Sequence, residues 1–117
     1  MDGLAELLKG RPPEVVLLCE KLVAAVEPLD DVRIEVSPKV LVLHGANRIF
    51  GSIRPTQRGL NVHLNLPHHV EDRRVTRSEP LTKKLTFYRF MLSSSEDLDE
   101  QFTNWISEAH DASRTGR

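Results

Sequence analysis

The sequence has one cysteine, Cys19, among its 117 residues, and lacks the marks of an exported or membrane-bound chain. Cys19 lies in the apolar run VVLLCEKLVAAV, so we expect a buried side chain in a reducing compartment. No stretch approaches the roughly 18 apolar residues that a membrane-spanning helix needs. The first residues, MDGLAELLKG, lack the basic start and the apolar core of a signal peptide. We therefore expect a cytoplasmic protein that does not bind membranes.

Motifs that carry known chemistry are also missing. Only 6 glycines occur, and they form neither a phosphate-binding loop nor the Gly-x-Ser-x-Gly turn of a hydrolase. The consecutive serines at 93–95 precede acidic residues and are better explained as a helix cap than as nucleophiles. We therefore predict no catalytic residues and no cofactor.

The formal net charge of −1 hides an uneven distribution. Between residues 48 and 89, nine arginines and lysines face only three acidic residues. Residues 96–111 contain six acidic residues and no arginine or lysine. The basic section and the acidic one can attract each other within the fold, or the basic section can meet an anionic partner. The first interpretation is slightly favoured.

Hydrophobic periodicity predicts an α+β domain. Helical patterns cover residues 2–9 and 12–26, and a Ser94-capped helix with Leu98, Phe102, Trp105, Ile106 and Ala109 on one face closes the chain. Between them lie about five strands, near residues 32–36, 40–44, 48–54, 60–66 and 84–92. Residues 67–82 show no periodicity and are predicted to form a long surface excursion. Two N-terminal helices, an antiparallel meander and a C-terminal helix packed on the sheet predict a two-layer fold. A single domain is expected at 1–111, with a flexible tail at 112–117.

Three stretches together resemble a bacterial family of unknown function. They are IFGSIRPTQRGLNVHLNLP (49–67), LTFYRFMLSSSEDLDEQF (85–102) and WISEAHD (105–111). In this combination the chain resembles the domain of unknown function 5655 and, more distantly, small YdhG-like domains. The resemblance spans roughly residues 1–111 and implies an α+β fold without an established reaction. Matching positions that could carry function are Arg54, Tyr88 and Arg89, whereas VSPKV (36–40) and His110 depart from the pattern.

The arginines suggest a face that binds anions. Arg89 shares strand parity with Leu85, Phe87 and Met91, so it points to the same side as three apolar residues. An irregular strand, an internal pair with a carboxylate, or a groove lined by that face would each explain this placement. Arginine together with aromatic and amide side chains can hold a phosphate or a nucleic acid backbone. The predicted ligand-binding residues are Arg54, His63, Tyr88, Arg89, Arg73 and Arg74.

Three histidines within LNVHLNLPHHV (60–70) raise an alternative function. A metal-handling protein or an enzyme could use His63, His68 or His69 with Tyr88 and Arg89. Adjacent histidines on an extended chain point to opposite sides, so only one of His68 and His69 could join His63. No metal site is therefore predicted. The favoured interpretation places His63 with Asn61 and Asn65 on a solvated or groove-lining strand face.

The predicted function is a small non-enzymatic binding or accessory domain. Its working surface would be the exposed sheet face and the basic 67–84 loop, and its partner an anionic small molecule or protein. Nucleic acid is not favoured, because strong nucleic-acid binders are usually net basic. Apolar residues on both faces of 40–43 and 49–53 also predict a homodimer through the sheet.

Overall fold

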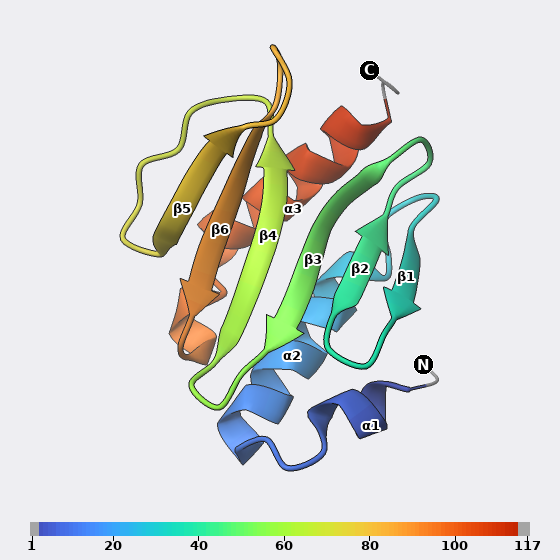
Figure 1. Ribbon diagram of the computed structural model, residues 1–117, viewed down its shortest axis with the longest axis vertical. Coiled ribbons are helices and arrows are strands. Elements are labelled where there is room, and N and C mark those ends of the chain that lie inside the picture. Colours follow the sequence, from blue (N-terminus) through green and yellow to red (C-terminus); the bar gives the residue numbers. More distant parts are fainter. Residues whose placement is uncertain (1–2, 115–117) are drawn as a thin grey trace.

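The computed structural model describes residues 3–114, and Figure 1 shows how their helices and strands are arranged. The elements in chain order are α1 (Leu4–Leu8), α2 (Pro13–Val26), β1 (Arg33–Val36), β2 (Leu41–His44), β3 (Ile49–Pro55), β4 (Leu60–Leu66), β5 (Val75–Pro80), β6 (Thr86–Leu92), a 3-10 turn η1 (Ser95–Asp97) and α3 (Glu100–Ser113). The first helix was predicted to begin at residue 2, which lies outside the described residues. The α+β prediction is confirmed.

The two N-terminal helices form where the prolines and the apolar stripe predict them. Pro13 occupies the first turn of α2, where its missing N–H costs no helical hydrogen bond. The predicted stripe is buried, with Val15, Leu18, Cys19, Leu22 and Val26 all between 0% and 4% exposed. Cys19 is buried as predicted, and this burial raises the pKa of its thiol to about 11.

The sheet has six antiparallel strands in the order β1-β2-β3-β4-β6-β5. The meander from β1 to β4 follows the prediction, but the predicted surface excursion at 67–82 contains an additional strand. β5 forms an outer edge and pairs only with β6, which lies between β5 and β4. Its residues are exposed apart from half-buried Val75, so it has no apolar alternation by which the sequence could reveal it.

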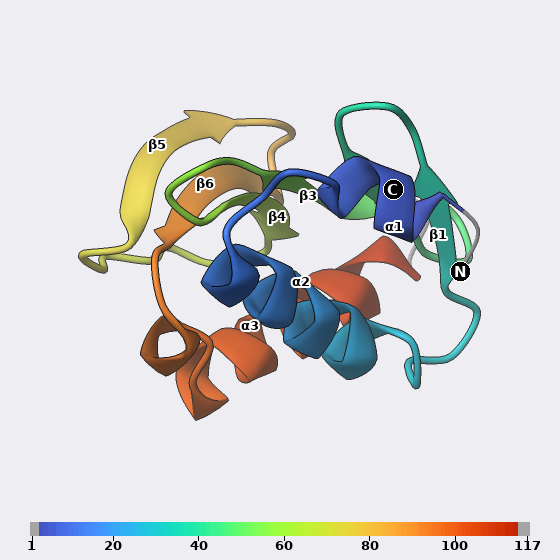
Figure 2. The ribbon, with the colours of Figure 1, turned by 90° about the horizontal axis from the view of Figure 1, so that it is seen from below.

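Helices α2 and α3 cover one face of the sheet, as the view in Figure 2 shows. The core fills this interface: Phe90 of β6 stacks on Trp105 at 5.3 Å between ring centroids and meets Phe102 edge-on at 5.1 Å. α1 lies at one end of the sheet. Within residues 3–114, no helix covers the opposite face, which we call the open face. None of the described helices is both long enough and apolar enough to cross a membrane.

The C-terminal helix begins later and ends later than predicted. Ser94 precedes η1 rather than α3, and the Asp97 carboxylate accepts the N–H groups of Ser93 and Ser94. Asp99 is the true cap of α3, because its side chain accepts the Phe102 N–H at 2.9 Å. At the other end, α3 continues to Ser113, which is buried, so the predicted boundary at residue 111 falls inside this helix. Residues 115–117 of the predicted tail lie outside the described residues.

Candidate functional site

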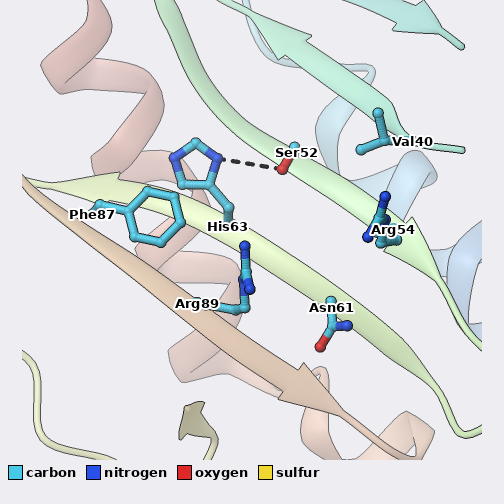
Figure 3. A pocket seen from close by; sticks show the side chains of 7 residues that line it. All are labelled: Val40, Ser52, Arg54, Asn61, His63, Phe87 and Arg89. Atoms are coloured by element: carbon cyan, nitrogen blue, oxygen red, sulfur yellow. Dashed lines mark hydrogen bonds between the residues drawn. The ribbon is translucent and has the colours of Figure 1, made fainter. Parts of the chain in front are cut away.

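A cavity of about 290 Å³ lies on the open face of the sheet. Figure 3 shows the seven residues that line it, which come from the position just before β2 and from β3, β4 and β6: Val40, Ser52, Arg54, Asn61, His63, Phe87 and Arg89. Its volume lies just below the usual range for ligand pockets, roughly 300–1,000 Å³. The site therefore suits a small ligand or one group of a larger one.

Strand pairing brings the polar side chains together. Ser52 of β3 pairs with His63 of β4, which pairs in turn with Arg89 of β6. Arg54 pairs with Asn61 one step along the same face. Because side chains two residues apart on a strand share a face, these two cross-strand rows project together from the open face.

His63 occupies the centre of this arrangement. Its Nε2 lies 2.6 Å from Asn65 Oδ1, and its Nδ1 lies 3.3 Å from Ser52 Oγ. Its ring stacks on Phe87 with centroids 4.3 Å apart. Burial lowers the pKa of His63 below its usual value, and the nearby positive charge of Arg89 lowers it further, against an opposing effect of the Asn65 hydrogen bond. The imidazole is therefore held in its neutral form near pH 7.

The cavity is positively charged and has no carboxylate in its lining. Among the described residues, neither Arg54 nor Arg89 forms an ion pair. The Arg89 guanidinium instead lies 5.8 Å from the centroid of Phe87. The sequence leaves three explanations for why Arg89 points to the same side of its strand as apolar residues. The structure supports the third, in which that face of the strand lines a groove.

Three of the six predicted ligand-binding residues, Arg54, His63 and Arg89, meet in this cavity. Tyr88 does not, because alternation turns it to the opposite face of β6, where it is 2% exposed. Its hydroxyl accepts the Val70 N–H at 2.9 Å and donates to the His68 carbonyl at 3.4 Å. Tyr88 therefore anchors the segment that follows β4 and does not reach the cavity.

Arg73 and Arg74 also lie away from the cavity. Arg74 is 5% exposed, and its guanidinium bonds the Asp72 carboxylate at 2.7 Å and the Asp99 carboxylate at 2.9 Å. Arg73 is 72% exposed and bonds Asp97 at 2.8 Å. Both arginines join the link before β5 to the start of α3. Most guanidinium donors of Arg74 already bond protein oxygens, so the geometry gives no support to anion binding by Arg74, which stays a prediction.

These contacts confirm the expectation that the basic and acidic sections attract each other. A third contact, between His68 Nε2 and Glu108 Oε1 at 3.0 Å, links the same segment to α3. The hydrogen bond to Glu108 is the main cause that raises the pKa of His68. The attraction uses only part of the basic section, because Arg54 and Arg89 remain on the open face.

The three histidines of 60–70 have separate partners. His63 bonds side chains of the open face, His68 bonds Glu108 on α3, and His69 bonds Glu71 at 3.0 Å. No group of three or more His, Cys, Asp or Glu within residues 3–114 is arranged to hold a metal ion. The residues of the predicted alternative divide between two cavities: His63 and Arg89 line the cavity on the open face, whereas His68, His69 and Tyr88 line a separate one.

Sequence reasoning did not select Ser52 or Val40 as site residues. Ser52 is the only hydroxyl residue of β3, and Val40 precedes β2, so neither has a local signal. Only the register between strands, which local sequence does not encode, brings Ser52 beside His63.

Comparison with known proteins gives a family but no characterised relative. The chain has no significant match among curated proteins or among solved structures. Residues 4–113 match the profile of the domain of unknown function 5655 (DUF5655), which confirms the resemblance inferred from the sequence. Since this match spans nearly the whole chain, the protein belongs to the DUF5655 family.

Proposed function

We propose that the protein is a small cytoplasmic binding or accessory domain, without enzymatic activity, that binds an anionic ligand through the open face of its sheet. The observation that carries this proposal is the pair of arginines, Arg54 and Arg89, which line one cavity with no acidic residue in its lining. Uncompensated guanidinium groups on a concave surface favour carboxylate or phosphate ligands. Asn61 and Ser52 add neutral polar groups at the same cavity.

The basic segment 67–84 contributes a second, weaker surface in this proposal. Arg73, Arg74 and Arg77 already have acidic partners, whereas Lys83 and Lys84 lie exposed in the turn between β5 and β6. These lysines line a separate cavity of about 370 Å³ together with His68 and His69. They favour attraction of an anionic partner without defining a specific contact.

A titration with pyrophosphate at constant ionic strength, monitored through the backbone amide signals in NMR spectra, tests the proposal. We expect shifts centred on β3, β4 and β6, and an affinity at least about tenfold weaker when both arginines are replaced, since hydrogen bonds to charged groups contribute roughly 1.5–3 kcal/mol each. The variant is Arg54→Gln with Arg89→Gln. Arg58→Gln is the matched control, because Arg58 is exposed in the turn after β3 and lies outside the cavity.

The outcome that contradicts the proposal is equally specific. Equal pyrophosphate affinity in the wild type, the double variant and the Arg58 control would show that Arg54 and Arg89 do not form the site. Stronger loss in a Lys83→Gln, Lys84→Gln variant than in the arginine variant would move the site to the β5–β6 turn.

A further inference from the structure

We infer that the open-face cavity takes a doubly charged oxyanion of the phosphate type, and that His63 gains a proton when this anion binds. The inference rests on the proposed function and adds to it the ligand class and a linkage to pH. The hydrogen bonds of Asn65 define where the proton of neutral His63 lies.

The neutral form of His63 has a defined tautomer. Asn65 Nδ2 donates to the Ile49 carbonyl, 3.4 Å away, and a carbonyl oxygen cannot donate in return. The other end of the Asn65 amide, Oδ1, therefore faces His63 and accepts a hydrogen bond from Nε2. With its proton on Nε2, neutral His63 has a lone pair on Nδ1, which accepts a hydrogen bond from the Ser52 hydroxyl.

Protonation reverses the hydrogen bond between His63 and Ser52. When Nδ1 gains a proton it becomes a donor, and the Ser52 hydroxyl either accepts from it or turns to donate elsewhere. Both side chains line the cavity, as Figure 3 shows. The protonated state therefore offers the cavity one additional positive charge and frees one O–H donor for a bound anion.

The surroundings of His63 oppose this protonation until an anion arrives. Arg54 faces the cavity from β3, and Arg89 and Phe87 face it from β6. Two acidic residues of the open face are engaged: Glu35 of β1 bonds His44, and Glu79 of β5 bonds Arg77. With burial and Arg89 both disfavouring the imidazolium, a negative charge in the cavity would favour it.

The number and type of donors select the ligand class. Two guanidinium groups and one imidazolium would surround the anion, and a dianion balances this charge better than a single carboxylate. Guanidinium forks match tetrahedral oxyanions through paired hydrogen bonds. The volume of about 290 Å³ admits a free phosphate or the phosphate end of a larger monoester.

The sign of the pH dependence follows from this linkage. The complex would hold one more proton than the free protein, so affinity rises as the pH falls. The increase approaches about tenfold per pH unit between the pKa of free His63 and its higher pKa in the complex. Phosphate itself titrates near pH 6, so its own charge change would obscure the effect.

Sulfate is the decisive probe, because it stays doubly charged throughout this range. Calorimetric titrations with sulfate at constant ionic strength should show an affinity that rises as the pH is lowered from about 8 to about 5.5. The same titrations in buffers of different ionisation enthalpy should show that binding takes up close to one proton. NMR of the wild-type imidazole should show the pKa of His63 rising on addition of sulfate, which tests the inference even if a variant fails to fold.

Two histidine variants complete the test. His63→Gln should bind sulfate with little dependence on pH, whereas His44→Gln should keep the wild-type dependence, because His44 lies outside the cavity lining and pairs with Glu35. Inorganic phosphate and glycerol 3-phosphate at about pH 7.5 then separate a free ion from a monoester, since only a monoester site gains affinity from the organic group.

Failure of the inference differs from failure of the proposed function. Sulfate binding that depends on Arg54 and Arg89 but not on pH, with no change in the pKa of His63, would overturn the proton linkage and leave the anion site intact. Sulfate and pyrophosphate affinities that are unchanged by the arginine substitutions would overturn both.

Discussion

Arg73 and Arg74 are neighbours in the sequence with opposite environments. Arg74 is buried, bonds Asp72, Asp99 and the Asp97 carbonyl, and lies 5.1 Å from the centre of the Trp105 ring. Arg73 lies in solvent with one carboxylate partner. Both were predicted as ligand-binding residues, because a sequence gives their charge but not the long-range contacts that bury one of them.

Replacement of Arg74 should therefore cost far more stability than replacement of Arg73. Arg74→Met leaves the partly exposed Asp72 and Asp99 without their cation and the Asp97 carbonyl without its donor, which costs about 2 kcal/mol. Arg73→Met is the matched control and should change the free energy of unfolding by less than about 1 kcal/mol. Urea denaturation monitored by circular dichroism measures the stability of both variants. Equal urea midpoints for the two would contradict the assignment of Arg74 as a structural residue.

Residues of the cavity were partly predictable. Alternation along LNVHLNL places Asn61 and His63 on the face opposite the leucines, and the same rule places Arg89 beside Phe87. The rule gives the face of each strand separately. It does not give which residues of neighbouring strands lie opposite one another, so Ser52 could not be assigned to His63.

The strands and helices themselves were largely predictable where one face is apolar. β4 has buried residues at Leu60, Val62 and Leu64, and this alternation gave its bounds correctly. β5 has only Val75 as a partly buried apolar residue, because it pairs on one edge alone. A strand that buries so little has no periodic signal, and it was therefore missed.

The turn between β3 and β4 depends on Gly59. A Cβ at this position would lie 2.0 Å from the Leu92 carbonyl oxygen. In addition, the φ of Gly59, +157°, is unfavourable for residues other than glycine. Gly59→Ala should force β4 away from the end of β6 and lower the free energy of unfolding by about 2 kcal/mol or more, as strained core changes do. Thermal unfolding measures the loss.

Gly10 supplies the matched control for this prediction. It has a φ of +80°, yet nothing lies within 4 Å of the Cβ position. Gly10→Ala should therefore cost only the backbone penalty, about 1–2 kcal/mol. A loss for Gly10→Ala as large as that for Gly59→Ala would contradict a steric role of Leu92.

The whole molecule presents chemically different sides. Helices α2 and α3 cover one face of the sheet, and the open face carries Arg54 and Arg89 without acidic partners. The predicted homodimer through the sheet stays a prediction. If two copies met through their open faces, four guanidinium groups would face one another, and the open-face carboxylates Glu35 and Glu79 already pair with His44 and Arg77.

We therefore expect this dimer to form only when an anion bridges the two cavities. Sedimentation equilibrium at one ionic strength should give a monomer in chloride and a mass increase in sulfate, because sulfate neutralises the facing arginines. The Arg54→Gln, Arg89→Gln variant should lose the response to sulfate. A wild-type dimer of equal stability in chloride and sulfate would contradict this arrangement.

The position of β6 between β4 and β5 constrains the order in which a newly synthesised chain can complete its sheet. β5 precedes β6 in the chain but hydrogen-bonds only to it, so residues 75–80 have no partner strand until residues 86–92 have left the ribosome. The five residues that join the two strands make their hairpin a local and rapidly formed unit. The hairpin can then add to β4 as a preformed pair, which brings Arg89 beside His63 and finishes the cavity in a late step of folding.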